Sequence, residues 1–356
     1  GEAFGDNYEL PNMTAYNETC AAISMVYLFE RMFLLHGESK YIDCMERTLY
    51  NGVISGMSMD GGRFFYPNPL SSDGKYKFNA DGNTTRQPWF GCACCPSNLC
   101  RFIPSVPGYL YGVKDNNIYV NLFAGNTSTI KVNGKDVVLE ETTEYPWNGD
   151  IKIAVKKSGV KNANLLVRIP GWVRNQVVPS DLYKYSDAEK PAYTVTVNGK
   201  AVEADLDANK GYLPVKNIKK GDVIRIHFDM PVRTVVANGK VADDKGKVAV
   251  ERGPLVYCAE AVDNSNEPVL HAVMPEKPSF TLVDNYSIQN TETKGAPAFT
   301  VKAIVTSPAH IIYQKKEDVV AVDCTPLTLI PYYAWNHRGA NQMNVWFYQG
   351  LSFMDK

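Results

Sequence analysis

The sequence has no excess of charge of either sign and no long hydrophobic run. Its 37 lysines and arginines balance 38 aspartates and glutamates, which leaves a formal net charge of -1. Proteins that bind nucleic acid carry a strongly basic face, so we expect no nucleic-acid partner. No run approaches the length of a membrane span, and no basic region followed by an apolar core opens the chain. We therefore expect no membrane span and no signal peptide in these residues, and the compartment, cytoplasmic or periplasmic, stays open.

Histidine is also scarce, with 5 residues in 356, whereas the 8 cysteines are unevenly placed. The cysteines gather toward the N-terminal end and do not form a spread disulfide framework, which favours reduced or metal-bound thiols. Four of them fall between Cys92 and Cys100. Adjacent Cys94 and Cys95 can bridge to each other only with severe strain, because a disulfide needs more widely spaced Cα atoms. This cluster therefore predicts a metal ion or a reactive thiolate, although free cysteines are often small buried hydrophobes.

A second pair of potential ligands lies near the N-terminus, where Glu18 and Cys20 stand two residues apart. Zinc accepts a carboxylate and a thiolate together in a four-coordinate site. Glu18 is equally well placed to cap a helix, since a carboxylate at a helix N-terminus interacts favourably with the dipole. The isolated cysteines lie in apolar surroundings, which predicts core positions for Cys44, Cys100, Cys258 and Cys324.

The first third of the chain is predicted to be helical and the rest to form strands, with the boundary near Tyr111-Gly112. Dense apolar residues over 18–35 predict one helix that stops at His36-Gly37. Apolar residues at every third or fourth position over 39–58 predict an amphipathic helix antiparallel to the first, in an αα-hairpin.

A long loop over 59–90 follows this hairpin, and long loops inside compact domains are usually functional. One more helix is predicted over 97–106. It would place Cys94 and Cys95 near a helix N-terminus, where the dipole favours the thiolate.

Beyond residue 117 the sequence alternates between apolar and polar residues, as over 118–123, 150–155 and 222–228. This period predicts antiparallel β-sandwich architecture. Asn-Gly pairs at residues 133, 198 and 238 predict tight turns between strands. Polar stretches over 263–268 and 285–295 are predicted connections, and 343–348 is the last predicted strand. The expected domains are residues 1–112, 113–235 with a last strand from 340–356, and 236–339 as a second β-sandwich.

Five motifs resemble one known family. They are Gly1-Glu2-Ala3-Phe4, Tyr16-Asn17-Glu18-Thr19-Cys20-Ala21, Cys92-Ala93-Cys94-Cys95-Pro96-Ser97-Asn98, Arg168-Ile169-Pro170-Gly171-Trp172 and Glu251-Arg252-Gly253-Pro254-Leu255. The chain resembles the carboxy-terminal half of glycoside hydrolase family 127, the β-L-arabinofuranosidases, with sister family 146 close. Members of this family combine an (α/α)6 barrel that carries the active site with β-sandwich domains behind it. The resemblance therefore implies an α+β multidomain fold, with partial (α/α)6-barrel helices followed by antiparallel β-sandwich domains.

The resemblance also implies roles for individual residues. It implies zinc as a cofactor, with Glu18, Cys20, Cys94 and Cys95 as its ligands. Cys94 would double as the nucleophile, and Glu2 would be the general acid/base. Retaining glycosidases ordinarily use two carboxyl groups, and a zinc-bound thiolate would replace the attacking one. Cys92 lies outside the family's metal shell and is expected to support packing.

Aromatic residues near the cysteines are candidates to line a furanose pocket, because aromatic faces often stack on sugar rings. The candidates are Tyr8, Tyr66, Trp89 and Phe90, together with Phe64 and Phe65. None of the histidines lies in a motif that matches the family. A six-hairpin barrel needs more helices than the roughly three predicted here. We therefore expect a truncated form whose helices over 18–58 keep exposed apolar faces, which favours a homo-oligomer.

The function that these observations predict is a retaining glycoside hydrolase that releases terminal β-L-arabinofuranose from plant glycans. Its partner would be an oligosaccharide or polysaccharide substrate, although this chain alone could be inactive. Two alternatives stay open. One is a glycosidase for another sugar of plant pectin. The other is a non-catalytic, zinc-stabilised β-sandwich protein that binds carbohydrate or a partner chain.

Overall fold

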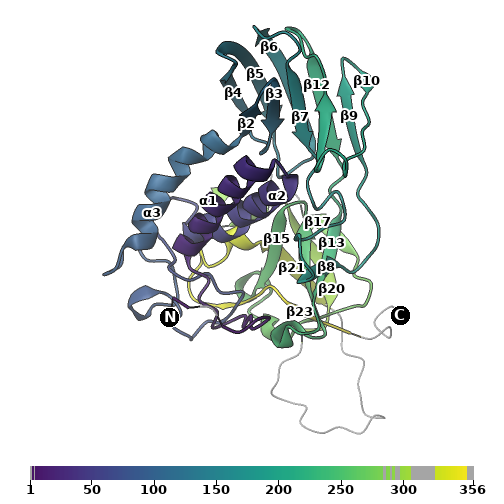
Figure 1. Ribbon diagram of the computed structural model, residues 1–356. Coiled ribbons are helices and arrows are strands. Elements are labelled where there is room, and N and C mark those ends of the chain that lie inside the picture. Colours follow the sequence, from purple (N-terminus) through teal and green to yellow (C-terminus); the bar gives the residue numbers. More distant parts are fainter. Residues whose placement is uncertain are drawn as a thin grey trace.

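The computed structural model describes residues 2–3, 5–283, 286–288, 291–292, 297–305 and 325–350. A layer of helices lies beside a two-sheet β-sandwich and a larger, curled sheet (Figure 1). The predicted change from helix to strand is confirmed, because the β region opens with β2 (Tyr111–Lys114). The described part of the chain is mostly β-sheet with few helices, as the α+β expectation requires.

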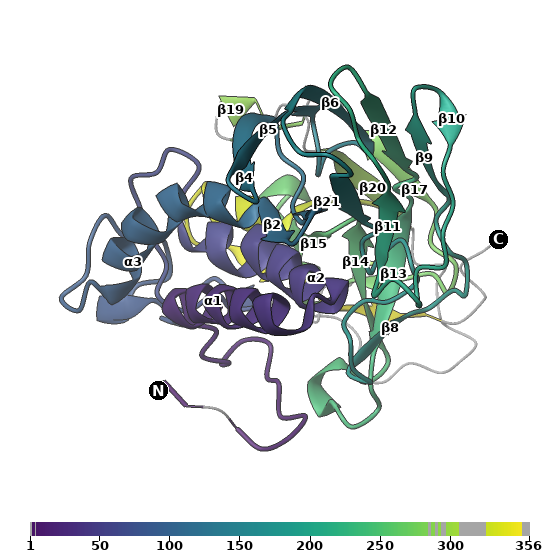
Figure 2. The ribbon, with the colours of Figure 1, turned by 45° about the horizontal axis from the view of Figure 1, so that its top comes forward.

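The first two helices form the predicted hairpin, α1 (Thr19–His36) followed by α2 (Ser39–Arg47), and lie side by side in Figure 2. Gly37 ends α1 in the left-handed region at φ 64°, and its N–H donates to the Phe33 carbonyl at 2.7 Å. Glycine adopts this conformation without a steric penalty, which is why the His36-Gly37 stop is correct.

The second helix does not continue as an α-helix to residue 58, so that prediction is wrong beyond Arg47. A π-helical turn, η1 (Thr48–Val53), and a 3-10 turn, η2 (Ile54–Gly56), follow it. The side chain of Asn51 donates to the carbonyls of Arg47 and Pro254 and accepts from the Val256 N–H. An asparagine that bonds to nearby backbone competes with the regular helical ladder.

By length and composition alone α1 could cross a membrane, which the sequence analysis did not expect. It packs against α2, η1 and the third helix, α3 (Cys94–Phe102). Four of its apolar side chains are exposed, as expected: Met25, Leu28 and Leu35 on the side away from the buried residues, and Leu34 on its flank. The role of this face in self-association stays a prediction.

The helix predicted over 97–106 begins earlier, since α3 starts at Cys94 and continues as the 3-10 helix η4 (Ile103–Tyr109). Pro96 is compatible with this start, because the first turn of a helix has no internal partners for its N–H groups. The predicted loop over 59–90 contains a short strand, β1 (Ser71–Asp73), and a 3-10 turn, η3 (Ala80–Gly82).

The sandwich consists of a six-stranded sheet in the order β10-β9-β12-β6-β5-β4 and a four-stranded sheet in the order β11-β7-β3-β2. Its strands are β3 (Asn117–Val120), β4 (Asn126–Val132), β5 (Lys135–Thr143), β6 (Asp150–Ser158), β7 (Asn164–Arg168), β9 (Tyr193–Val197), β10 (Lys200–Ala201), β11 (Tyr212–Val215) and β12 (Val223–Phe228). Alternate residues of β6, such as Ile151, Ile153 and Val155, are buried in the core shared by both sheets. The pair β3 and β7 is parallel, so the sandwich is not wholly antiparallel.

Two of the three predicted tight turns are confirmed. Asn133-Gly134 and Asn198-Gly199 both have positive φ at each residue and join paired strands, as a type I′ turn requires. The third is confirmed only as a turn, in which the Val241 N–H donates to the Asn238 carbonyl at 2.9 Å. It is not a two-residue hairpin, because a longer connection with the 3-10 turn η5 (Ala242–Asp244) joins β13 (Val232–Ala237) to β14 (Lys247–Arg252). There the Asn238 side chain donates to Asp181, in the preceding part of the chain.

The curled sheet has eleven strands, with β16-β23-β14-β15-β21-β20-β17 as its main path. Its other four strands are β1, β8 (Tyr183–Tyr185), β13 and β22 (Gln342–Asn344). The strands of the main path not yet located are β15 (Leu255–Glu260), β16 (Val273–Met274), β17 (Phe280–Val283), β20 (Ala298–Ala303), β21 (Thr325–Pro331) and β23 (Phe347–Gln349). A separate pair joins β18 (Ser287–Ile288) to β19 (Thr291–Glu292).

Three short 3-10 turns complete the described chain, η6 (Ala261–Asp263), η7 (Val269–His271) and η9 (Tyr332–Ala334). The polar stretch over 263–268 connects η6 to η7, as predicted, whereas 285–295 lies partly outside the described residues. The strand predicted over 343–348 is broken at Val345-Trp346. Its two pieces, β22 and β23, pair inside the eleven-stranded sheet and not with the strands of 113–235, because Phe347 is buried beside Val248 in that sheet's core.

Two motifs of the β region anchor α2 through buried ion pairs. Arg168, which is fully buried, binds the carboxylate of Glu46 and donates to Asp43 Oδ1 at 2.7 Å. From the other motif, Glu251 binds Arg47 and is itself 2% exposed. These pairs fix the helices, and with them the N-terminus of α1, on the β scaffold.

Candidate active site

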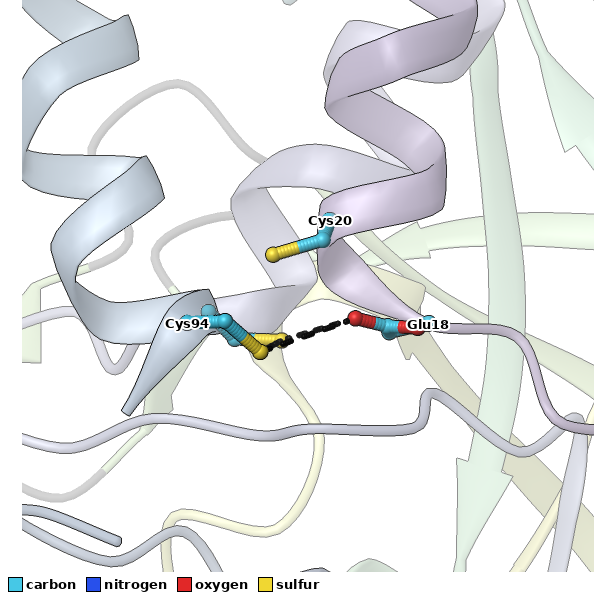
Figure 3. Close-up of side chains that lie close together, drawn as sticks. Glu18, Cys20 and Cys94 are labelled. Atoms are coloured by element: carbon cyan, nitrogen blue, oxygen red, sulfur yellow. Dashed lines mark hydrogen bonds between the residues drawn. The ribbon is translucent and has the colours of Figure 1, made fainter. Parts of the chain in front are cut away.

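Four potential metal ligands meet where the N-termini of α1 and α3 approach each other (Figure 3). Glu18 precedes α1 and Cys20 lies in its first turn, whereas Cys94 and Cys95 open α3. One ligand atom from each side chain lies within 4.8 Å of every other. The structure therefore brings together, from two distant parts of the sequence, a cluster that could hold a metal ion.

The spacing of these atoms suits a single tetrahedral ion. Cys94 Sγ lies 3.9 Å from Cys95 Sγ and 3.8 Å from Glu18 Oε1, and Cys95 Sγ lies 3.7 Å from the same oxygen. Sulfur ligands at about 2.3 Å from a tetrahedral ion are about 3.8 Å apart. The donor atoms of Glu18, Cys94 and Cys95 already stand at about the separations that a bound ion would impose, and that of Cys20 lies within 4.8 Å of each of them.

The alternative role of Glu18 as a helix cap is not realised. Glu18 occupies the position before the first residue of α1, but its side chain makes no capping hydrogen bond. Its carboxylate is instead directed at the thiols, as the dashed line in Figure 3 marks for Cys94. The Glu18 carboxylate is therefore available to a cation.

Burial acts on the thiols of this cluster. It raises the pKa of the Cys20 thiol to about 11, and it raises the pKa of Cys95 well above its ordinary value. A positive ion reverses such a shift, because a coordinating thiol is deprotonated outright. Without an ion Cys20 and Cys95 therefore favour neutral thiols, and with one they can be thiolates.

Tyr66 joins the cluster to the N-terminal segment. Its hydroxyl donates to Glu2 Oε1 at 2.6 Å and accepts from Cys94 Sγ at 3.1 Å. Burial, together with these two partners, raises the pKa of Tyr66 strongly, so the phenol keeps its proton. Two residues that the sequence predicted for separate roles, Glu2 and Cys94, are thereby linked through one hydroxyl.

The position of Tyr66 is fixed from both of its neighbouring elements. Its carbonyl accepts hydrogen bonds from the N–H and the hydroxyl of Thr19, at the start of α1. Its own N–H donates to the buried amide of Asn79 at 2.8 Å, and that side chain also donates to the carbonyls of Phe64 and Thr85. The loop over 59–90 is therefore held in place by internal amide bonds, and it delivers Tyr66 to the cysteines.

The other predicted aromatic residues are spread more widely. Phe90 packs 6.0 Å from the Tyr66 ring, whereas Trp89 beside it is 59% exposed. The Tyr8 hydroxyl donates to Asp181, and Lys240 lies over its ring. Phe65 is fully buried against Trp335, since alternation in an extended segment turns it away from Tyr66.

Tyr16 was missed as an aromatic neighbour of the site. Its ring meets the Tyr66 ring edge-on at 5.9 Å. Burial, followed by the charges of Glu18 and Glu2, raises the pKa of Tyr16. Its place two residues before Glu18, within one of the quoted motifs, was the signal that could have identified it.

The remaining cysteines divide into two groups. Cys258 is fully buried, as predicted, and burial raises the pKa of the partly buried Cys44 to about 12. Cys92 and Cys100 are exposed, so the expectations of packing support and a core position are wrong. Cys100 lies on the side of α3 opposite the buried Cys95, Leu99 and Phe102. Cys324 lies outside the described residues.

Comparisons with known proteins agree over nearly the whole chain. The GH127 catalytic domain of β-L-arabinofuranosidase matches residues 1–108, the GH127 middle domain matches 117–230, and the glycoside hydrolase family 127 C-terminal domain matches 232–348. A non-reducing end β-L-arabinofuranosidase of Bifidobacterium longum subsp. longum is 33% identical over 359 residues, which cover 97% of this chain and 51% of the relative.

Solved structures give the same result. A GH127 β-arabinofuranosidase is 52% identical with a TM-score of 0.88, over 98% of this chain and 52% of that chain. A GH127 β-L-arabinofuranosidase from Geobacillus stearothermophilus T6 is 34% identical with a TM-score of 0.83, over 98% of this chain and 52% of that one. The chain thus spans about half the length of the relatives that it matches.

The fold and the sequence together define the class as glycoside hydrolases. Within that class the chain belongs to glycoside hydrolase family 127, as its motifs predicted.

Proposed function

We propose that this chain is the part of a retaining β-L-arabinofuranosidase that carries its nucleophile, its acid/base and a zinc ion. The observation that supports this proposal is the continuous contact from the Glu18, Cys20, Cys94 and Cys95 cluster through Tyr66 to Glu2. The substrate would be a terminal β-L-arabinofuranoside of a plant glycan.

The donor set fits zinc, because three thiolates and a carboxylate are ligands that zinc accepts in tetrahedral sites. Glu18, Cys20, Cys94 and Cys95 would hold the ion, which would keep the Cys94 thiol deprotonated near neutral pH.

In the first half of the reaction, Cys94 Sγ attacks C1 of the sugar. An S–C1 bond forms as the C1–O bond to the leaving group breaks, and Glu2 gives its proton to the leaving oxygen. Tyr66, which keeps its proton, donates to Oε1 of Glu2 and so positions this carboxyl group. In the second half, water attacks C1, its proton passes to Glu2, and the Cys94 thiolate leaves.

The separation of the two groups agrees with retention. The contacts of 2.6 Å and 3.1 Å through the Tyr66 hydroxyl limit Glu2 Oε1 and Cys94 Sγ to about 5.7 Å apart. Retaining enzymes hold their two groups about 5–5.5 Å apart, whereas inverting enzymes need about 6.5–9.5 Å to admit a water.

The described residues hold three α-helices, and an (α/α)6 barrel would need further ones to close a sugar pocket over the cluster. We propose that residues 1–112 carry part of such a barrel, and that 113–235 and 236–339 form β domains behind it. Tyr8, Tyr66, Trp89 and Phe90 remain candidate substrate contacts.

The test is covalent labelling of Cys94 in the protein as it is encoded. An arabinofuranose-derived electrophile should modify Cys94 with one sugar mass per chain, mapped by peptide mass spectrometry. The variant Cys94→Ser should lose both the label and turnover of an aryl β-L-arabinofuranoside. The matched variant Cys92→Ser should keep both. A metal-loaded protein that never labels at Cys94 would support the non-catalytic alternative.

A further inference from the structure

A polar cleft of about 770 Å³ lies where the six-stranded sheet meets the eleven-stranded sheet. Three segments line it, 148–150, 187–192 and the connection 227–233 from β12 to β13, together with Arg252 at the end of β14. Figures 1 and 2 both place β12 and β13 on the side of the molecule opposite α3. The cleft is therefore separate from the cysteine cluster, and the proposed reaction does not use it.

Arg233 supplies the first indication that this cleft takes a ligand. The residue is 7% exposed, with its guanidinium 3.5 Å over the Tyr185 ring. It donates from Nε and Nη2 to the Asp187 carboxylate and from Nη2 to Asn175. Its Nη1 has no hydrogen-bond partner among the described residues, although it is buried. A buried donor without an acceptor costs free energy, and Arg233 is one of the residues that line the cleft.

Arg252 supplies a second cation, and unlike Arg233 it has no acidic partner in the described part of the chain. Its Nε donates to the Met230 carbonyl at 3.0 Å and its Nη1 to the Trp147 carbonyl at 2.7 Å. Burial lowers its pKa. Arg252 belongs to a motif that the catalytic proposal leaves without a chemical role, because its neighbour Glu251 is the residue that anchors α2.

Acceptors line the same cleft. His227 is held at both ring nitrogens, by Asp150 at 2.7 Å and by Asp229 at 3.1 Å. The bond to Asp150 raises the pKa of His227. Each of these carboxylates has a second oxygen that this histidine does not use. Asp187 and Glu189 add two more carboxylates to the lining.

The balance of these groups selects the ligand. Four carboxylates line the cleft with three permanently charged cations, Lys190, Arg233 and Arg252, and with His227, which lies between two of the carboxylates. An anion would meet the carboxylates and a metal ion would meet the arginines, so neither is favoured. A hydroxyl group both donates and accepts, and a row of hydroxyls satisfies mixed donors and acceptors. Apolar side chains between them, such as Met230 and Pro191, suit the C–H face of a sugar ring.

We propose that this cleft is a second, non-catalytic binding site for a short neutral oligosaccharide segment. Its volume lies within the range of about 300–1,000 Å³ that small-molecule sites occupy. The choice of a saccharide over another polyol rests on the proposed function. The site would hold a glycan chain while its terminal residue reaches the cysteines on the same or another chain.

Titration calorimetry with a neutral arabino-oligosaccharide of three to five units tests the proposal, in a Cys94→Ser background that prevents turnover. Arg252→Gln, and separately the double variant Glu189→Gln with Asp229→Asn, should each weaken binding at least tenfold. Glu203→Gln, an exposed change outside the cleft, should leave it unaltered. Hydrogen exchange on the same samples should show that the ligand protects residues 148–150 and 187–192. Unchanged exchange in the rest of each variant shows that the variant is folded.

Three results would each contradict a neutral-saccharide site in this cleft. No binding of the neutral probe at millimolar concentration, equal binding by the cleft variants, or tighter binding of an acidic trigalacturonate would each overturn it. Labelling of Cys94 is independent of these results. A cleft that binds while Cys94 stays unlabelled would overturn the catalytic proposal alone, and the reverse result would overturn only the second site.

Discussion

Replacing Arg168 by methionine should destabilise the protein more than any nearby surface change. Arg168 is fully buried and donates to Glu46, to Asp43 and to the Asn121 carbonyl. Methionine preserves most of the apolar stem but leaves the Glu46 carboxylate, which is 2% exposed, without its cation. Removing one partner of a buried ion pair costs about 3–5 kcal/mol.

A matched control comes from Arg174, which donates to the other Asp43 oxygen at 2.7 Å but is 20% exposed. Arg174→Met should cost only about 1 kcal/mol, because the Asp43 carboxylate keeps Arg168 as its cation. The free energy of unfolding is measured by urea denaturation at pH 5 and pH 8. Burial already raises the pKa of Glu46. Losing Arg168 raises the pKa of Glu46 further. The destabilisation by Arg168→Met should therefore be smaller at pH 5, where Glu46 becomes neutral.

Adding Glu46→Gln to Arg168→Met should recover part of the loss, since it removes the unpaired charge. A double-mutant cycle should give a coupling of about 2 kcal/mol. The reasoning is refuted if Arg168→Met costs no more than Arg174→Met at both pH values.

Three further predictions concern single sites. Burial raises the pKa of Glu141 to about 8 from an ordinary 4.5. The contribution of Glu141 to stability should therefore fall as pH rises from 4.5 to 8, and urea denaturation of Glu141→Gln should show that this loss is gone. Cys92 and Cys100 should react with a thiol reagent in the native protein while Cys258 reacts only after unfolding, and protection of the first two would contradict their exposure. Tyr66→Phe should lower kcat about 10²-fold with unchanged metal content, and an unaltered kcat would exclude a role for its hydroxyl.

Local patterns made parts of the fold predictable. Gly37 ends α1 because glycine adopts the left-handed conformation without a steric penalty, and Gly134 allows the Asn133-Gly134 turn for the same reason. Asn238-Gly239 makes a turn but no two-residue hairpin, and the Asn238 side chain has a distant partner, Asp181, that no local pattern reveals. The early end of α2 has the same cause, since Asn51 is bonded to Pro254 and Val256. In both places contacts with residues distant in the sequence determine the local structure.

The candidate site was predictable in its ligand types but not in its connections. Thiols and a carboxylate with metal-ligand chemistry stand out in the sequence, so Glu18 and Cys94 could be named before their distance was known. The bridge through Tyr66 could not, because it depends on the fold of a long loop that buried amides hold together. The burial of Cys100 was also predicted wrongly. Cys100 has apolar neighbours in sequence, but the helical period turns it outward.

Metal analysis tests the central claim most directly. The purified protein should contain one zinc per chain, with X-ray absorption showing three sulfur ligands and one oxygen. Cys20→Ser and Cys95→Ser should each lose most of the metal, whereas Cys92→Ser and Cys100→Ser should retain it. A protein without stoichiometric metal, or metal that survives loss of Cys20 and Cys95, would contradict the four-ligand site.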